Sequence, residues 1–149
     1  MSESEREELA GALADDSMCF ACGRKNPDGL HLTFEYEDRA VTTRHAFEKR
    51  FQGYRGVVHG GLVSTVLDEA MVTLLNHMGL LAMTAELTVR YLRPVPIGRT
   101  VTVTARLVGS RRRVHEVEAE AVLEDGQVAA RAEGRFMSLE APAVRKGGC

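Results

Sequence analysis

The chain has 149 residues, of which 44% are hydrophobic and 27% are charged, and its net formal charge at pH 7 is −2. This length and composition are typical of one soluble globular domain, and the slight acidic balance argues against a nucleic-acid-binding protein. The most apolar stretch, Met71 to Met83, is too short and too polar to span a membrane. Three cysteines form no secreted disulfide framework, and the acidic start Ser2 to Glu8 is unlike a signal peptide, so we expect a cytoplasmic protein.

The chain is expected to contain one folded domain between two peripheral segments. Glu3 to Ala14 has a helix-forming composition, so residues 1–17 are predicted to be an N-terminal helix or a flexible arm. The domain itself is expected over residues 18–140, followed by a flexible tail over residues 141–149. It begins with Cys19 to Gly29, whose Gly, Pro, Asn and Asp content predicts a structured loop.

Two strands and one helix are predicted next. His31 to Tyr36 alternates in polarity and predicts a strand, and Ala40 to Phe47 predicts a second strand after a turn. Phe51 to Gly56 predicts a loop that contains glycine. From Leu62 to Leu75 the apolar residues recur at helical spacing in one broad stripe, which predicts a helix covered on most sides.

After this helix the sequence alternates with period two. The alternation predicts four antiparallel strands, with one turn at Gly109–Ser110 and a hairpin at Asp125–Gly126. Two strands, one long apolar helix and four strands predict an α+β fold in which a curved antiparallel sheet wraps the helix. The open sheet edges would be covered if two copies paired edge to edge, so we expect at least a homodimer.

The turn His59-Gly60-Gly61 precedes the apolar helix, which carries Asp68 and Glu69. In isolation such a turn is more often a simple helix cap. Here, however, it would expose backbone N–H groups at the positive end of a helix dipole, where they polarise a carbonyl oxygen. Apolar neighbours flank Asp68, so we expect a partly desolvated carboxylate that acts as a base, and we expect Glu69 on a solvated face. Together these features favour a site for acyl chemistry.

His59 and Asp68 are about 13 Å apart on a continuous helix, which is too far for both to act on one substrate within one chain. A second subunit with an antiparallel helix would bring its Asp68 opposite Gly60. The predicted dimer would therefore also complete the site.

Two other features have alternative interpretations. Cys19-x-x-Cys22 resembles half of a zinc site or a redox pair, but His31 and His45 lack metal-ligand spacing, so we expect no metal. Arg111-Arg112-Arg113, considered with Arg90 and Arg93, is either a solvated hairpin tip or a site for the phosphates of a nucleotide-bearing substrate.

The stretch from Phe51 to Glu69, followed by Thr84-Ala-Glu-Leu and Arg93-Pro-Val-Pro, resembles the hotdog-fold acyl-CoA thioesterases of the PaaI-like group. The loop Cys19-x-x-Cys-Gly-x-x-Asn-Pro-x-Gly-Leu is similar to that of one subgroup, and the resemblance spans about Cys19 to Leu139. It implies a hotdog fold, an acyl-CoA substrate, no cofactor, and a homodimer or homotetramer that binds coenzyme A at the subunit interface.

The resemblance also implies residue roles. The N–H of Gly60 polarises the thioester carbonyl, Asp68 activates water, Thr84 orients that water, and His59 positions the turn. Chemically, Asp68 could also attack as a nucleophile. Many members carry Asn where this chain has Gly53, so either Gln52 or Gly60 alone has to hold the carbonyl. The residues expected to bind substrate are Gly61, Gln52, Arg90, Arg93, Arg111 and Arg112.

Three other functions fit parts of the pattern. A hotdog hydratase or dehydratase needs a His and an acid that meet at one β-hydroxyacyl carbon, in motifs of a different order. A non-catalytic acyl-CoA-binding module has no reason to bury Asp68 beside a thioester. A purely structural dimer leaves the site residues without a role. Hydrolysis of an acyl-CoA is therefore the favoured interpretation.

Overall fold

The computed structural model describes residues 2–12 and 15–139. Its elements, in chain order, are α1 (Glu3–Ala12), β1 (Glu35–Glu37), β2 (Ala40–Ala46), the 3-10 turn η1 (Lys49–Phe51), α2 (Gly60–His77), β3 (Ala82–Tyr91), β4 (Thr100–Arg111), β5 (Val114–Leu123) and β6 (Val128–Ser138). The predicted order of two strands, one long helix and four strands is therefore confirmed. No helix among the described residues is long and apolar enough to cross a membrane.

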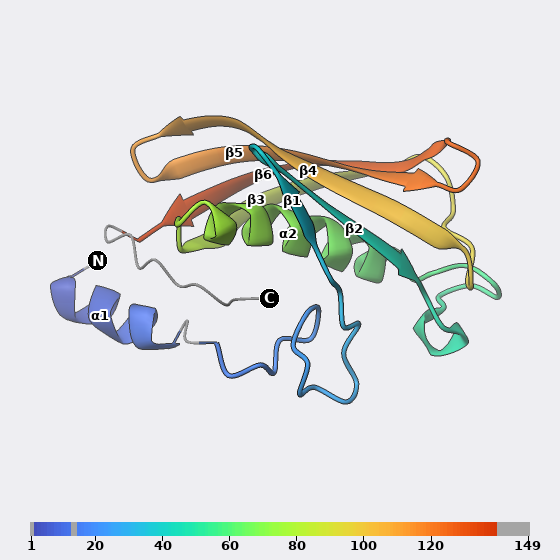
Figure 1. The fold of residues 1–149 in the computed structure, drawn as a ribbon, viewed down its shortest axis with the longest axis horizontal. Helices are drawn as coiled ribbons and strands as arrows, with labels where there is room; N and C mark the ends of the chain where they lie inside the picture. Colours follow the sequence, from blue (N-terminus) through green and yellow to red (C-terminus); the bar gives the residue numbers. More distant parts are fainter. Residues whose placement is uncertain (1, 13–14, 140–149) are drawn as a thin grey trace.

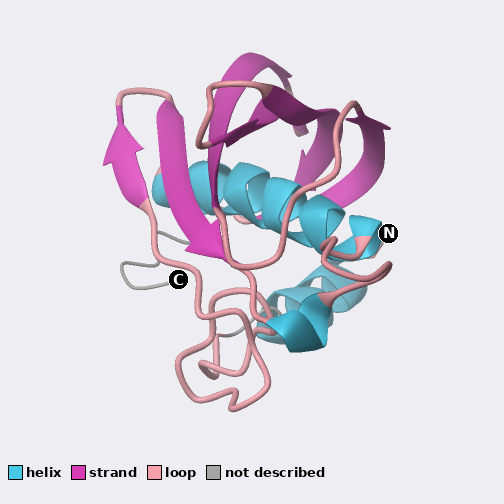
Figure 2. Ribbon diagram, turned by 90° about the vertical axis from the view of Figure 1, so that its right-hand side faces the viewer, coloured by secondary structure: helices cyan, strands magenta, loops and turns pink. Residues whose placement is uncertain are grey.

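The strands form one antiparallel sheet in the order β1-β2-β4-β5-β6-β3. The sheet curves around α2, which lies against its concave face, as Figure 1 and Figure 2 show. The loop before β1 lies on the side of α2 that faces away from the sheet (Figure 1). β3 ends the sheet, so one of its edges is open in the described chain.

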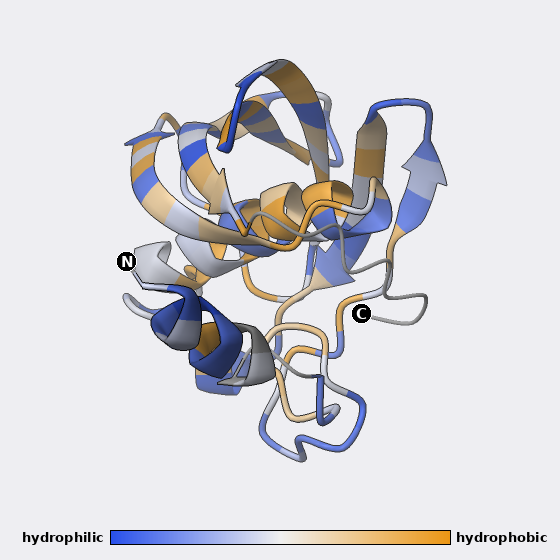
Figure 3. Cartoon of the chain, turned by 90° about the vertical axis from the view of Figure 1, so that its left-hand side faces the viewer, coloured by the Kyte–Doolittle hydropathy of each residue, from blue (hydrophilic) through white to orange (hydrophobic). Residues whose placement is uncertain are grey.

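The apolar stripe of α2 forms the centre of the core. Six of its side chains are at most 1% exposed: Val66, Leu67, Ala70, Met71, Leu74 and Leu75. The inward positions of β4, β5 and β6 are largely small, and Ala105, Ala121 and Ala130 are fully buried. Small side chains allow the helix to approach the sheet closely. The alternation of hydrophilic and hydrophobic residues along the strands in Figure 3 reflects this division between an inner apolar face and an outer polar face.

The first strand is shorter than predicted. Residues 31–34 are not part of it, and β1 begins at Glu35. His31 has a φ of 53°, and its ring nitrogen lies 2.5 Å from the carbonyl oxygen of Asn26. The N–H of Leu32 donates to the carbonyl of Ala21 rather than to a strand. The alternation of polarity therefore extends over a segment that pairs with the preceding loop.

The predicted turn at Gly109–Ser110 is wrong. β4 continues to Arg111, and the chain turns at Arg112, whose φ is 56°. The pairing of β4 with β5 shifts by one residue between Leu107 and Gly109. The glycine therefore follows a bulge inside a longer hairpin and does not mark its end.

A substitution at Gly134 on β6 would test how closely α2 packs against the sheet. A Cβ atom at this position would lie 2.5 Å from Cε2 of Phe136 and 2.8 Å from Sδ of Met71. We expect Gly134→Ala to destabilise the protein by about 1–3 kcal/mol, measured by urea denaturation. Gly109→Ala is the matched control, because a Cβ there meets no atom within 4 Å. Equal stability of the two variants would contradict this packing.

Candidate active site

Backbone hydrogen bonds fix the His59 turn before α2 begins. The N–H of Val58 donates to the carbonyl of Val95 at 2.9 Å, and the N–H of His59 donates to the carbonyl of Phe51 at 3.0 Å. His59 is the N-cap of α2, and its Nδ1 accepts the N–H of Gly61 at 3.0 Å. The turn is therefore held on both sides. Because the His59 ring accepts the N–H of Gly61, that N–H, which was expected to bind substrate, already has a partner.

The amide of Gly60 is the N–H that this turn leaves available. The carbonyl of His59, in the same peptide group, accepts N–H groups of Leu62 and Val63 at 2.9 and 3.3 Å. The N–H of Gly60 has no acceptor among the described residues. It lies in the first turn of an 18-residue helix, where the dipole favours negative charge. This amide is therefore free to donate to a negatively charged or polarised oxygen.

Tyr91 holds the neighbouring peptide group and was not predicted as a site residue. Its hydroxyl donates to the carbonyl of Gly60 at 3.0 Å and accepts a hydrogen bond from the hydroxyl of Ser64. The peptide group between Gly60 and Gly61 is thus held at its carbonyl by Tyr91 and at its N–H by His59. Tyr91 lies on the same inward face of β3 as Leu87 and Val89. The alternation of these three residues in the sequence was the signal that could have placed Tyr91 near the helix.

Asp68 lies half-buried on the side of α2 that faces β3. The hydroxyl of Thr84 donates to its Oδ1 at 2.7 Å. Burial raises the pKa of Asp68 above its ordinary value, and the hydrogen bond from Thr84 opposes that rise. The predicted partial desolvation of Asp68 is therefore confirmed, and the structure brings Asp68 and Thr84 together.

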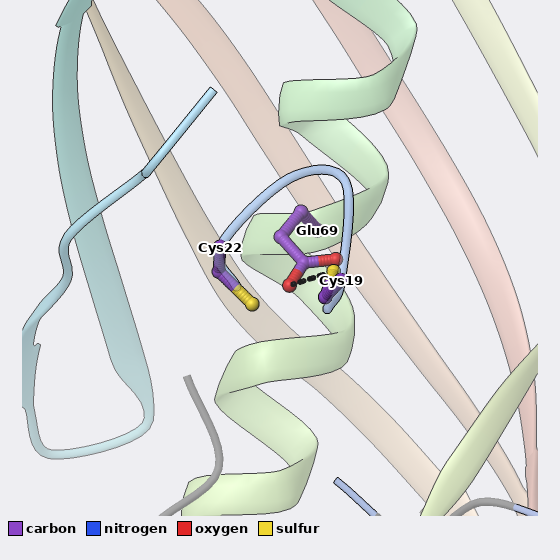
Figure 4. Close-up of side chains that lie close together, drawn as sticks. All are labelled: Cys19, Cys22 and Glu69. Atoms are coloured by element: carbon purple, nitrogen blue, oxygen red, sulfur yellow. Dashed lines mark hydrogen bonds between the residues drawn. The ribbon is translucent and has the colours of Figure 1, made fainter. Parts of the chain in front are cut away.

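Glu69 is not on a solvated face, so that expectation was wrong. It is half-buried against the Cys19–Gly29 loop, and its Oε1 accepts the thiol of Cys19 at 3.7 Å (Figure 4). Burial raises the pKa of Glu69, the bond from Cys19 lowers it, and the nearby charge of Asp68 raises it. The loop that covers Glu69 comes from another part of the chain, which helical periodicity does not report.

Glu69 also approaches the two cysteines of the CxxC motif. Ligand atoms of Cys19, Cys22 and Glu69 all lie within 4.8 Å of one another, as Figure 4 shows. Thiols and carboxylates bind zinc, and a closed structural site uses four ligands. Glu69 was not predicted as a ligand, because the sequence pattern offered only the histidines His31 and His45 as further candidates.

Gly53, where the sequence resemblance leads us to expect Asn, lies close to the His59 turn. A Cβ at Gly53 would lie 3.2 Å from Cα of His59, so the chain passes close to the turn here. The side-chain oxygen of Gln52 accepts the N–H of Gly56 at 3.2 Å. This oxygen therefore closes the local loop, and Gln52 is oriented by its own turn.

The structure does not bring all predicted residues together. Gly60 and Asp68 are eight positions apart on α2, which corresponds to about 12 Å along the helix axis. Arg90 pairs with Arg131, whereas Arg111 pairs with Val114, which in turn pairs with Met137. Arg90 and Arg93 therefore lie at one end of the sheet, and the arginine hairpin tip lies at the other.

Comparisons with known proteins bear on this arrangement. The family model described as the thioesterase superfamily matches residues 55–130. The chain is similar to a solved thioesterase superfamily protein, with 27% identity, a TM-score of 0.77, and coverage of 91% of this chain and 76% of the other. No curated protein matches the chain.

Two further solved structures share the fold. The E. coli PaaI protein from the phenylacetic acid degradation operon has 18% identity and a TM-score of 0.73, with coverage of 93% of this chain and 96% of the other. A Streptococcus mutans protein bound to acetyl CoA has 21% identity and a TM-score of 0.69, with coverage of 72% and 88%. The predicted hotdog fold is therefore confirmed.

The Thr84 hydroxyl provides a direct test of the Asp68 environment. Its hydrogen bond stabilises the carboxylate, so Thr84→Val should raise the pKa of Asp68 further above the ordinary value. The titration midpoint of the Asp68 carboxyl carbon, followed by NMR, should move to higher pH. Thr84→Ser keeps the hydroxyl and should keep the midpoint. An unchanged or lower midpoint in Thr84→Val would show that this bond does not control Asp68.

Proposed function

This chain belongs to the thioesterase superfamily, and we propose that it hydrolyses an acyl-CoA to a free acid and coenzyme A. The observation that carries the proposal is that α2 presents two reactive groups. The N–H of Gly60 has no hydrogen-bond acceptor among the described residues, so it suits a developing oxyanion. The partly desolvated carboxylate of Asp68, bonded by Thr84, suits the activation of water.

In the proposed reaction, Asp68 takes a proton from water as the water oxygen attacks the thioester carbonyl carbon. The N–H of Gly60 donates to the oxyanion, an interaction worth roughly 3 kcal/mol in comparable acyl transfers. The carbon–sulfur bond then breaks, and coenzyme A leaves as a thiolate, which takes up a proton from solvent. The hydroxyl of Thr84 orients Asp68 and the attacking water. His59 and Tyr91 position the Gly60 turn without touching the substrate.

The two prepared groups belong to one site only in a homodimer. The open edge of β3 carries exposed apolar side chains, with Met83 40% and Tyr91 54% exposed. Antiparallel pairing of two β3 strands would cover these edges and place the helices antiparallel. Gly60 of one subunit would then lie opposite Asp68 of the other. We propose that this dimer is the active unit, alone or within a tetramer.

Asp68→Asn tests the proposed reaction. We expect kcat to fall at least a hundredfold, because general base catalysis typically contributes 10²–10⁴-fold. The measurement is thiol release with dithionitrobenzoate over a panel of short, long and aromatic acyl-CoAs. Glu69→Gln is the matched control, since it makes the same chemical change at the next position, where the side chain contacts Cys19. It should retain most activity.

Two outcomes would contradict the proposal. If the wild type binds acyl-CoA but releases no thiol, the chain is a binding module. If Asp68→Asn keeps full activity, the base lies elsewhere. Sedimentation of the wild type tests the dimer separately, and a monomer with full activity would exclude the shared site.

Tyr91→Phe tests the positioning of the Gly60 turn. Loss of the hydroxyl releases the carbonyl of Gly60, so we expect kcat to fall about tenfold while KM changes less than twofold. Tyr54→Phe is the control, because Tyr54 is 87% exposed. A rise in KM with unchanged kcat would indicate instead that Tyr91 contacts the substrate.

A further inference from the structure

The loop before β1 places two cysteine sulfurs beside a carboxylate of α2, and the proposed reaction uses none of these three groups. Cys19 and Cys22 come from the loop and Glu69 comes from the helix, and their side chains point toward one another in Figure 4. The ligand atoms of all three lie within 4.8 Å of one another. Within residues 2–12 and 15–139, this is the one group of three or more such side chains that could hold a metal ion.

The separation of these atoms is close to that of ligands around one zinc ion. Tetrahedral zinc holds a thiolate sulfur at about 2.3 Å and a carboxylate oxygen at about 2.1 Å, so a sulfur and an oxygen ligand are about 3.6 Å apart and two sulfurs about 3.8 Å apart. Sγ of Cys19 lies 3.7 Å from Oε1 of Glu69. Since every separation is at most 4.8 Å, side-chain movements of about 1 Å would close the site around a metal.

Backbone hydrogen bonds hold the part of the loop that carries both cysteines. The N–H of Gly23 donates to the carbonyl of Cys19 at 2.8 Å, and a Cβ at Gly23 would lie 2.4 Å from the amide nitrogen of Cys19. The N–H of Leu32 donates to the carbonyl of Ala21, between the cysteines, at 2.9 Å. Cys22 itself is buried. Because this backbone is already ordered, binding of a metal would cost little further conformational entropy.

The donor atoms determine which kind of metal the group would bind. Thiolates are soft ligands and favour Zn²⁺, whereas Mg²⁺ and Ca²⁺ prefer oxygen ligands. Binding releases the protons of the two thiols, so that two thiolates and one carboxylate face the divalent cation. Water would complete the four positions of a zinc ion that has three protein ligands.

The oxidation state of Cys22 determines whether this set of ligands is complete. Cys19 is a free thiol, whereas Cys22 is disulfide-bonded in this structure. The thiolate is the form of cysteine that binds metals, so the set is complete only when that disulfide is reduced. A phosphine reductant converts the disulfide to two thiols and is itself oxidised to the phosphine oxide.

We propose that the reduced chain binds one zinc ion through Cys19, Cys22 and Glu69, and that this ion fixes the loop with both cysteines against α2. The proposal differs from the sequence prediction of no metal, which considered only histidines as further ligands. It is independent of the proposed hydrolase reaction, because none of the three ligands takes part in that reaction.

Calorimetric titration with Zn²⁺ in the presence of the phosphine tests the site. We expect the wild type to bind one Zn²⁺ per chain. Glu69→Gln should weaken binding at least tenfold and Cys19→Ser or Cys22→Ser at least a hundredfold, since loss of even an outer-shell partner costs about 10–100-fold. Asp68→Asn is the matched control, because it makes the same chemical change at the adjacent position, where the side chain bonds Thr84, and it should keep the wild-type affinity. Absence of binding, or equal binding by the ligand variants, would overturn the proposal.

Cobalt(II) identifies the donor atoms in the unsubstituted protein. Thiolate ligands give Co²⁺ a sulfur-to-metal charge-transfer absorption, which oxygen ligands do not give. We expect this absorption in the reduced wild type and its loss after oxidation with diamide, which takes up two electrons and two protons as two thiols become a disulfide. Cys149→Ser, at a position outside the described residues, should keep the absorption. Its loss in Cys149→Ser, or its persistence after oxidation, would overturn the assignment of the ligands.

Hydrogen exchange tests the effect of the metal on the loop. In the reduced wild type, Zn²⁺ should slow the exchange of the amides of residues 19–29 at least tenfold, and it should not do so in Glu69→Gln. The amides of β5 should exchange at the same rate with and without Zn²⁺. Unchanged exchange of the loop with Zn²⁺ bound would overturn the proposed fixing of the loop, whether or not any thioester is hydrolysed.

Discussion

The packing of α2 against the concave face of the sheet is the interaction on which the rest of the structure depends. Leu67, Met71 and Leu74 are fully buried, and each such side chain contributes about 1.5–3 kcal/mol relative to exposure. Rotation of the helix would expose this stripe. The direction of its polar positions is therefore fixed, so that Asp68 contacts β3 and Glu69 contacts the Cys19–Gly29 loop. Partial desolvation of both acids is a consequence of the core.

The same packing holds the first turn of α2 beside β3. The carbonyl of Gly60 accepts the Tyr91 hydroxyl because α2 and β3 are held in a fixed position relative to each other. The His59 ring accepts the N–H of the next residue, Gly61. One donor and one acid result, at a separation that the helix keeps constant. Neither can approach the other within the chain. In the proposed hydrolase these groups are two half-sites, and symmetric pairing of two copies is the simplest arrangement that joins them.

The helix, the strands and the partial burial of Asp68 could be predicted from the sequence, because burial imposes a period of two residues on strands and of 3.6 residues on helices. The contact of Glu69 with Cys19 and the bond of Tyr91 to Gly60 could not, because they join residues 50 and 31 positions apart. Periodicity identifies the apolar face of a helix but not the loop that covers another face. The errors at His31 and Gly109 have a different cause. There, a left-handed residue and a bulge changed the backbone locally while the polarity pattern continued.

The separation of Gly60 and Asp68 on α2 has a consequence for the proposed reaction. In the proposed dimer, one subunit would supply the Asp68 carboxylate with its hydrogen bond from Thr84, and the other would supply the Gly60 amide. Each chain alone would then lack an essential part of the site, so that hydrolysis would require assembly.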